Sequence, residues 1–208
     1  MELEGLVFAG GPIDDLSLLE LLPEALVAAL TKKNGFISHR GGFHLRGACV
    51  GPWWHSLRQA WEGTLAFHNL YSCVGPADIP FGEDCMGDQF LIRDATVVRL
   101  RAETGELESL DVALPTFLQD IQADALEILQ LQPLLQFEQE GGTLSPGQLL
   151  AVYPPFFTEA ASRSLRAIDA RERRSFLAEV AGQIRDVPDG AAVKFVVEPL
   201  SKGRPTTG

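Results

Sequence analysis

Short runs of apolar residues, separated by polar turn residues, fill the middle of the chain between residues 79 and 110. Such runs are typical of short strands in an antiparallel sheet. The connection at residues 103–106 supplies a Gly where a tight hairpin needs a positive φ angle. Residues 82–84 are expected to form an acidic turn at the start of this meander. The predicted strands cover residues 89–92, 96–100 and 107–110.

Apolar residues at helical spacing lie on both sides of the meander. Asp14 and Asp15 precede the first such stretch, and Pro23 either begins a second helix there or kinks the first. Asp169 is expected to open the last helix. The other expected elements are helices over residues 52–62, 114–128 and 132–140, a short helix from residues 145–148, and extended segments at residues 36–45 and 193–197. We therefore predict an α+β fold, in which a central, mostly antiparallel sheet is flanked by N-terminal and C-terminal helices.

One stretch carries a family signature. Residues 79–85 read IPFGEDC, Gly87 and Phe90 follow, and the hairpin after Val98 reads ETGE. This stretch resembles the SUKH superfamily, an α+β domain shared by yeast cell-wall-synthesis regulators and many bacterial toxin-immunity proteins. Family members carry an IPFAEDCxGxxF segment and a V…ETGE hairpin, and Gly82 stands where Ala is common. The similarity spans about residues 30–200, through residues 34–36, 42–44 and 184–190.

The length and composition fit one globular domain. The chain has 208 residues, of which 46% are hydrophobic, and this is enough for one sizeable core. We expect a single SUKH-like domain over residues 1–208, with its core at about residues 14–140 and a helical and strand extension at about residues 141–200. The apolar runs are too short to cross a bilayer. Glu2 and Glu4 stand where a secretory signal carries Lys or Arg, so we expect a cytoplasmic protein without a membrane partner.

Acidic residues are concentrated in one segment of the chain. The net charge is −11, and residues 101–150 hold nine acids against Arg101 alone. We expect no binding to nucleic acid, because its phosphates repel such a chain, whereas a basic protein partner is attracted. The alternative is that the acids only keep the protein in solution. The candidate partner-binding residues are Glu83, Asp84, Glu103, Glu106, Glu108 and Asp111.

The sequence carries no recognisable catalytic motif, and we expect no enzyme. Glu83 and Asp84 precede Cys85, but neighbouring carboxylates raise the pKa of a thiol and so disfavour a nucleophile. We interpret the two acids as turn residues that accept bonds from backbone N–H groups. An enzyme would need a hidden pair, such as His55 with Glu83. The four histidines and three cysteines follow no metal-ligand spacing, so we expect neither a metal nor a cofactor.

A second candidate site combines aromatic and polar side chains. His44, Arg46, Trp54 and His55 could line a ligand pocket, with a guanidinium fork for a carboxylate and ring faces for stacking. The resemblance covers this segment too, since family members show LHxRG and WHSL patterns. Packing at the start of a helix is the alternative explanation. Five arginines between residues 163 and 174 are expected either to be solvated or to pair with the acidic segment of the chain.

Two functions remain open from the sequence. The resemblance and the acidic segment favour a non-catalytic immunity-type protein, which binds and neutralises a basic toxin such as a nuclease. The alternative is a regulatory or scaffold module that binds a peptide or a small ligand, because the SUKH superfamily also includes regulators. The sequence identifies neither the partner nor the oligomeric state.

Overall fold

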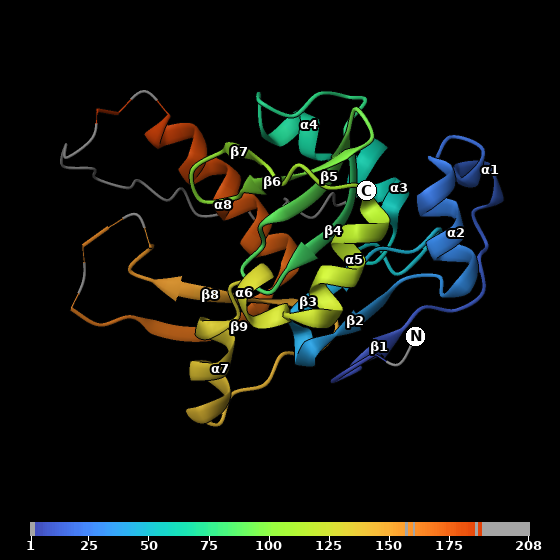
Figure 1. Cartoon of the computed structure of the whole chain (residues 1–208). Helices are drawn as coiled ribbons and strands as arrows, with labels where there is room; N and C mark the ends of the chain where they lie inside the picture. The colour runs from blue at the N-terminus through green and yellow to red at the C-terminus, as the bar shows by residue number, and fades with distance from the viewer. Residues whose placement is uncertain (1–2, 157, 160, 186, 189–208) are drawn as a thin grey trace, which may run out of the picture.

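The computed structural model describes residues 3–156, 158–159, 161–185 and 187–188. It is an α+β fold built on an antiparallel sheet of seven strands, as predicted. The strands neighbour one another in chain order, so the sheet is one continuous meander (Figure 1). They are β1 (Phe8–Ala9), β2 (Phe36–Ser38), β3 (Phe43–Leu45), β4 (Ile79–Asp84), β5 (Gln89–Arg93), β6 (Thr96–Arg101) and β7 (Glu106–Ser109).

A two-stranded antiparallel sheet and the last described helix follow this meander. Strands β8 (Gln148–Tyr153) and β9 (Ser164–Asp169) form the small sheet. The backbone N–H of Leu150 in β8 donates to the carbonyl of Cys85, 2.7 Å away, which ties the small sheet to the turn after β4. The helices are α1 (Leu16–Leu19), α2 (Glu24–Lys32), α3 (Leu57–Glu62), α4 (Phe67–Leu70), α5 (Leu114–Ala123), α6 (Ala125–Ile128), α7 (Gln132–Gln139) and α8 (Ala170–Ile184), with a short 3-10 turn η1 (His39–Gly41).

Apolar side chains on the two faces of the large sheet pack against different helices. Phe90 belongs to a core shared with Leu26 of α2 and Phe117 of α5. Leu91, the next residue, belongs to a second core shared with Phe67 of α4 and Ala181 of α8. This alternation follows from the pleat of a strand, which points successive side chains to opposite faces. The sheet is therefore covered on both faces.

A β-bulge in β4 decides which way the acidic residues point. Pro80 pairs with Leu91, whereas Gly82 pairs with Phe90, so the register shifts by one residue at Phe81. Without this shift Glu83 would share the face of Phe81, because their positions differ by two. The bulge instead turns Glu83 to the opposite face, which α8 covers.

Several predicted elements agree with the structure. Strands β5, β6 and β7 match the three predicted strands within one or two residues. The extended segment at residues 36–45 is the β2–β3 hairpin, and Pro23 begins a second helix, α2. The side chain of Asp169 accepts hydrogen bonds from the backbone N–H groups of Arg171 and Glu172, so it caps α8 as expected.

Other predicted elements were wrong. Residues 82–84 are not a turn but the end of β4, and the turn begins at Cys85. The helix expected over residues 52–62 begins only at Leu57, which leaves Trp54 in the preceding turn. The helix expected over residues 114–128 is interrupted at Asp124, whose φ of −150° is not helical and whose side chain caps α6.

The segment from residue 145 was also assigned wrongly. Gln148 does reach back, and its side-chain oxygen accepts from the backbone N–H of Ser145 at 3.0 Å, but this contact closes a turn before strand β8. Apolar Leu149 and Leu150 are buried in that strand by the small sheet and the β4–β5 turn. Strands β1 and β9 were not predicted. The strand expected at residues 193–197 lies outside the described residues.

Candidate functional site

Glu83 is the centre of a buried network of charged and polar side chains. Its carboxylate is 2% exposed and faces Arg46 at 3.0 Å, the Nε of Arg174 at 3.0 Å and the Nδ1 of His44 at 2.9 Å. Arg174 makes a second, very short contact with the other carboxylate oxygen. These partners come from β3, from the segment after it and from α8. Glu83 thus joins the C-terminal helix to the middle of the sheet.

Arg46 is fully buried, and both of its terminal nitrogens donate to groups inside the protein. Its Nη1 donates to the carbonyl oxygen of Pro80 at 2.7 Å and to that of Gly82 at 3.3 Å. Its Nη2 donates to Glu83 and, at 2.6 Å, to the side-chain oxygen of Gln89. Burial lowers the pKa of Arg46 to about 9, so the guanidinium remains charged at neutral pH. It holds the bulged strand in place and is closed to a ligand carboxylate.

Two histidines extend the network away from Glu83. Nε2 of His44 lies 2.9 Å from Nδ1 of His55, and Nε2 of His55 lies 3.2 Å from the backbone oxygen of Asn34. The chain of contacts runs between two acceptors, the Glu83 carboxylate and the Asn34 carbonyl. Three hydrogen bonds therefore need three N–H groups, but two neutral imidazoles carry only two. One of the three contacts lacks a proton unless the pair takes up one more.

The surroundings oppose that extra proton. Burial lowers the pKa of His55 to about 4, and the neighbouring His44 adds to this effect. Burial also lowers the pKa of His44, although its bond to Glu83 acts in the opposite direction. Burial would raise the pKa of Glu83, but Arg174 and Arg46 outweigh it and hold that pKa well below its ordinary value. Both rings are accordingly neutral at neutral pH.

The imidazole of His55 is enclosed by three glycines. A Cβ at Gly35, where φ is +75°, would lie 2.5 Å from Cε1 of His55. A Cβ at Gly10 or Gly47 would lie 2.7 Å from its Nε2. Such distances leave no space for any side chain other than hydrogen. The backbone therefore closes the end of the histidine chain against solvent.

We expect this enclosure to make stability fall in acid. Between about pH 6.5, the ordinary pKa of His, and about pH 4, the unfolded chain holds a proton at His55 that the folded chain does not. As the pH is lowered through this range, the free energy of unfolding should therefore fall by about 1.4 kcal/mol for each pH unit because of His55. Urea unfolding at pH 7, 6 and 5 would show a smaller decline for His55→Gln than for the wild-type chain. Parallel declines in the two proteins would contradict this prediction.

Asp84 organises the turn between β4 and β5. Its Oδ1 accepts hydrogen bonds from the backbone N–H groups of Met86, Gly87 and Asp88 at 2.9, 3.0 and 3.1 Å. This is the backbone-holding role predicted for the acidic pair, although only Asp84 performs it. Burial and the nearby Asp88 raise the pKa of Asp84 well above its ordinary value. The two aspartates repel each other and titrate as a pair.

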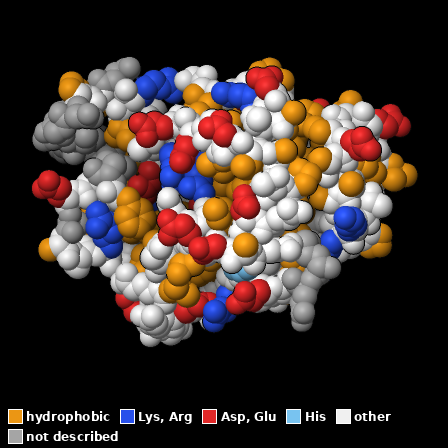
Figure 2. Space-filling view, in the orientation of Figure 1, with side chains coloured by type: hydrophobic (Ala, Val, Ile, Leu, Met, Phe, Trp, Pro, Cys, Tyr) orange, Lys and Arg blue, Asp and Glu red, His pale blue; other side chains and the backbone are white. Residues whose placement is uncertain are grey.

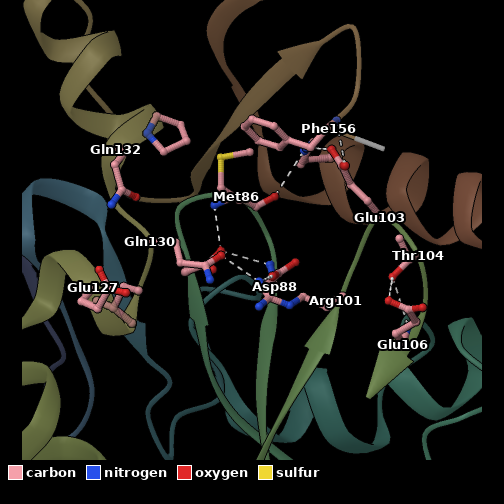
Figure 3. Close-up of a pocket in the computed structure, with 14 residues that line it drawn as sticks. Met86, Asp88, Arg101, Glu103, Thr104, Glu106, Glu127, Gln130, Gln132 and Phe156 are labelled. Atoms are coloured by element: carbon pink, nitrogen blue, oxygen red, sulfur yellow. Dashed lines mark hydrogen bonds and ion pairs between the residues drawn. The ribbon is translucent and has the colours of Figure 1, made fainter. Parts of the chain in front are cut away.

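A cavity of about 700 Å³ opens beside this turn, and we call it the acidic cavity. It lies between the sheet at β6–β7, the segment from α6 to α7, and α8 (Figure 3). Acidic side chains gather around a basic patch between β7 and α6 on the same face of the molecule (Figure 2). The charged residues that line the acidic cavity are the five acids Asp84, Asp88, Glu103, Glu106 and Glu127 and the two bases Arg101 and Arg173.

The six candidate partner-binding carboxylates have different environments. Glu103 and Glu106 line the acidic cavity, and Asp84 lines it from the turn. Glu108 and Asp111 are exposed on and after β7, at the edge of the large sheet. Glu83 must be removed from the set, because the bulge in β4 buries it and Arg46, Arg174 and His44 occupy its oxygens.

The second candidate set is brought together, but not around a ligand-sized space. His44 and His55 stack with ring centres 5.2 Å apart, and Trp54 lies 5.6 Å from each. The cavity beside His44 and Trp54 measures only about 10 Å³, which is room for about one water. The expectation of an open pocket at His44, Arg46, Trp54 and His55 is therefore corrected to a packed polar core. Within the described residues, no group of three or more His, Cys, Asp or Glu side chains is placed to hold a metal ion.

The sequence reasoning missed several residues of both sites. Asp88 and Gln89 belong to no recognisable sequence motif. The turn and pairing between β4 and β5 bring Asp88 to Asp84 and Gln89 to Glu83. The basic cluster did contain a signal, because pairing with the acidic segment was one of its two expected roles. Arg173 lies 3.5 Å from Glu103, which confirms that pairing for one residue of the segment. Arg174 pairs instead with Glu83.

Comparisons of the chain with protein-family models, with curated proteins and with solved structures find no match. The SUKH assignment therefore stays a prediction from the motif residues. None of the helices in the described part of the chain is long and apolar enough to cross a bilayer.

Proposed function

We propose that this chain is a non-catalytic cytoplasmic protein of the bacterial toxin-immunity type, which binds and neutralises a basic partner protein. The observation that carries the proposal is the acidic cavity together with the acidic edge of the large sheet next to it. The cavity is lined by five acids against two bases. Glu108 and Asp111 are exposed along the edge, where Glu108 pairs with Arg101 at 2.9 Å. The SUKH resemblance of residues 79–106 supports the same class of function.

Contact, rather than chemistry, suits the arrangement of reactive side chains. Burial and Asp84 raise the pKa of the Cys85 thiol well above its ordinary value, and burial raises the pKa of Cys49 to about 11. Neither thiol is a ready nucleophile at neutral pH. An enzyme would need a pair such as His55 with Glu83, but His55 is linked to Glu83 only through His44, and all three side chains are buried. The exposed carboxylates that a partner can reach are those of Glu106 and Glu127 at the acidic cavity and of Glu108 and Asp111 beside it.

Binding of a basic protein at this face should be fast and sensitive to salt. Carboxylates at the rim attract the partner over a Debye length of about 8 Å at physiological ionic strength. A nuclease, whose own active site must attract phosphates, presents basic groups of the matching sign. By occupying those groups, the acidic face would block the approach of nucleic acid.

The proposal is tested by co-purification with the toxin encoded beside this gene, and by association kinetics at low and high salt. We expect the variant Glu106→Lys/Glu108→Lys to lower the association rate about tenfold or more at low salt, since rim charges mainly set that rate. Its melting temperature should stay close to that of the wild-type chain. The matched control is Glu20→Lys/Glu24→Lys, at exposed positions directly after α1 and at the start of α2, at the other end of the molecule (Figure 1). No binding at any salt concentration, or equal effects of both variants, would contradict the proposal.

A further inference from the structure

The last strand of the large sheet has an open edge. Strand β7 pairs with β6 on one side, and no strand of the described residues lies on its other side. The backbone N–H of Leu110, directly after β7, donates to the carbonyl oxygen of Val97 at 3.0 Å. Because inward and outward groups alternate along an antiparallel strand, the N–H and C=O groups of Leu107 and Ser109 point away from β6. Within the described part of the chain, these backbone groups are available to a further strand.

The two faces of this edge differ in chemistry. Glu106 and Glu108 project to the face that borders the acidic cavity, together with the arginines of β6 that lie opposite them. Leu107 lies opposite Leu100, on the face of the second core. Both glutamates are exposed, whereas Leu107 is half-buried against that core. A strand added at this edge would therefore meet carboxylates on one face and apolar surface on the other.

One of the two carboxylates at the edge has no basic partner. The side chain of Glu106 accepts a hydrogen bond from the hydroxyl of Thr104 at 3.2 Å, and it forms no ion pair within the described residues (Figure 3). Glu108 is paired with Arg101 at 2.9 Å and with Arg99 at 4.0 Å. Acids at a sheet edge repel another acidic strand. The same charges attract a strand that carries Lys or Arg.

The apolar face of the edge is incompletely covered. Leu107 packs against the second core together with Leu70 and Cys73, and all three side chains are half-buried. Sγ of Cys73 donates to the carbonyl oxygen of Gly105 at 3.0 Å, which places the loop after α4 beside the turn before β7. An apolar side chain on an added strand would cover the surface that these residues leave exposed, and such burial favours association.

Other arrangements fit this edge less well. Pairing of β7 with β7 of a second copy would place carboxylates opposite carboxylates, which destabilises cross-strand pairs. The opposite edge of the sheet, β1, has two residues against the four of β7, so it offers a shorter ladder. A basic strand at β7 has neither disadvantage.

We propose that the basic partner protein docks by adding one strand, antiparallel to β7, to the open edge of the large sheet. This inference rests on the proposed function and names the mode of contact. The added strand alternates basic side chains, which face Glu106 and Glu108, with apolar side chains, which cover Leu107. Its apolar residues exchange backbone hydrogen bonds with Leu107 and Ser109, because directly opposed residues of an antiparallel pair share a face. Main-chain bonds then supply affinity, and the alternation supplies specificity.

The test is calorimetric titration of the full chain with an acetylated and amidated eight-residue peptide in which Lys and Val alternate. We expect a dissociation constant of about 0.1–1 mM for this peptide. A peptide with the same composition, but with its lysines and valines in two separate blocks, should bind about tenfold or more weakly. It controls for a general attraction between opposite charges.

Methylated peptides test the backbone pairing directly. N-methylation of the valines should weaken binding about tenfold or more, because their N–H groups face β7. N-methylation of the lysines, whose N–H groups face away, should change the affinity by less than about threefold. Amide hydrogen exchange locates the contact. The N–H groups of Leu107 and Ser109 should exchange about tenfold or more slowly when the peptide is bound, while those of Phe8 and Ala9 in β1 keep their rates.

Variants of the chain provide a second test. Ser109→Pro removes an outward N–H without removing a bond to β6, so it should weaken binding of the alternating peptide about fivefold or more. Ser109→Ala is the matched control, because it loses the same hydroxyl group and keeps the N–H. Glu106→Gln/Glu108→Gln should also weaken binding about fivefold or more and reduce its dependence on salt. If Ser109→Pro fails to fold, the methylated peptides test the same backbone contact.

Three outcomes would overturn the inference: equal binding of the alternating and block peptides, equal effects of the two methylations, or no binding up to about 10 mM peptide. Slow exchange of Leu107 and Ser109 in the chain alone would show that the edge is already occupied and would overturn it as well. If a toxin is captured while the alternating peptide does not bind, the proposed function stands and this mode of docking does not. If the peptide binds at β7 and no toxin is captured, the site stands and the function fails.

Discussion

Replacing Glu83 by Gln is expected to lower the free energy of unfolding by about 3–5 kcal/mol, because a buried ion pair that loses one partner leaves its charges uncompensated. Two guanidinium groups, those of Arg46 and Arg174, would then face each other without the carboxylate between them. His44 would lose its charged partner in the same step. Urea unfolding of the wild-type and variant chains at pH 7 measures the difference.

The control is Glu20→Gln, an exposed acid on the surface, which should change the free energy of unfolding by no more than about 0.5 kcal/mol. A second change tests the cause. Arg174→Met in the Glu83→Gln background removes one of the two stranded charges, so it should recover part of the lost stability. If the two substitutions are simply additive, or if Glu83→Gln is as mild as the control, Glu83 is not the centre of the network.

Asp84→Ala is expected to cost about 2–4 kcal/mol, because three backbone N–H groups of a buried turn lose their common acceptor. Asp84→Asn should have a much smaller effect at pH 7, or a stabilising one, since the amide oxygen still accepts and the repulsion from Asp88 disappears. The raised pKa of Asp84 gives a second signature. As the pH falls, the free energy of unfolding of the wild-type chain should rise relative to that of Asp84→Asn. The reason is that Asp84 and Asp88 take up a proton more readily in the folded chain than in the unfolded chain.

Thermal and urea unfolding of the wild-type chain and the two Asp84 variants at pH 5 and pH 7 would test both the difference between Ala and Asn and the expected pH dependence. Equal losses in the Ala and Asn variants would show that charge, and not the acceptor, is what the turn needs. The comparison also bears on function. Asp84 lines the acidic cavity, so a stable Asp84→Asn chain that still binds a basic partner assigns the residue to the architecture and leaves binding to Glu103 and its neighbours.

Local patterns predicted the elements whose formation depends on neighbouring residues. The strands after the β4–β5 turn, the hairpin Gly105 with its φ of +73° and the capped start of α8 are all set by residues within a few positions. The predicted turn at residues 82–84 failed for a tertiary reason. Polar residues normally leave a sheet, but Glu83 stays in β4 because Arg46 and Arg174 neutralise it there.

The sites depend on contacts between distant positions. Arg174 and Glu83 are separated by 91 residues, and no spacing rule connects them. The acidic cavity joins Asp88, Glu103, Glu127 and Arg173 from four segments of the chain.

The amino-acid sequence by itself determined the class of fold, the order of most elements and the concentration of acid between residues 101 and 150. Periodicity and turn chemistry act over a few residues, so they can be read along the chain. Only the tertiary structure decided which acids are buried and which face solvent. That choice depends on the one-residue bulge in β4 and on where α8 packs, and both are fixed by the packing of the whole molecule rather than by local preference.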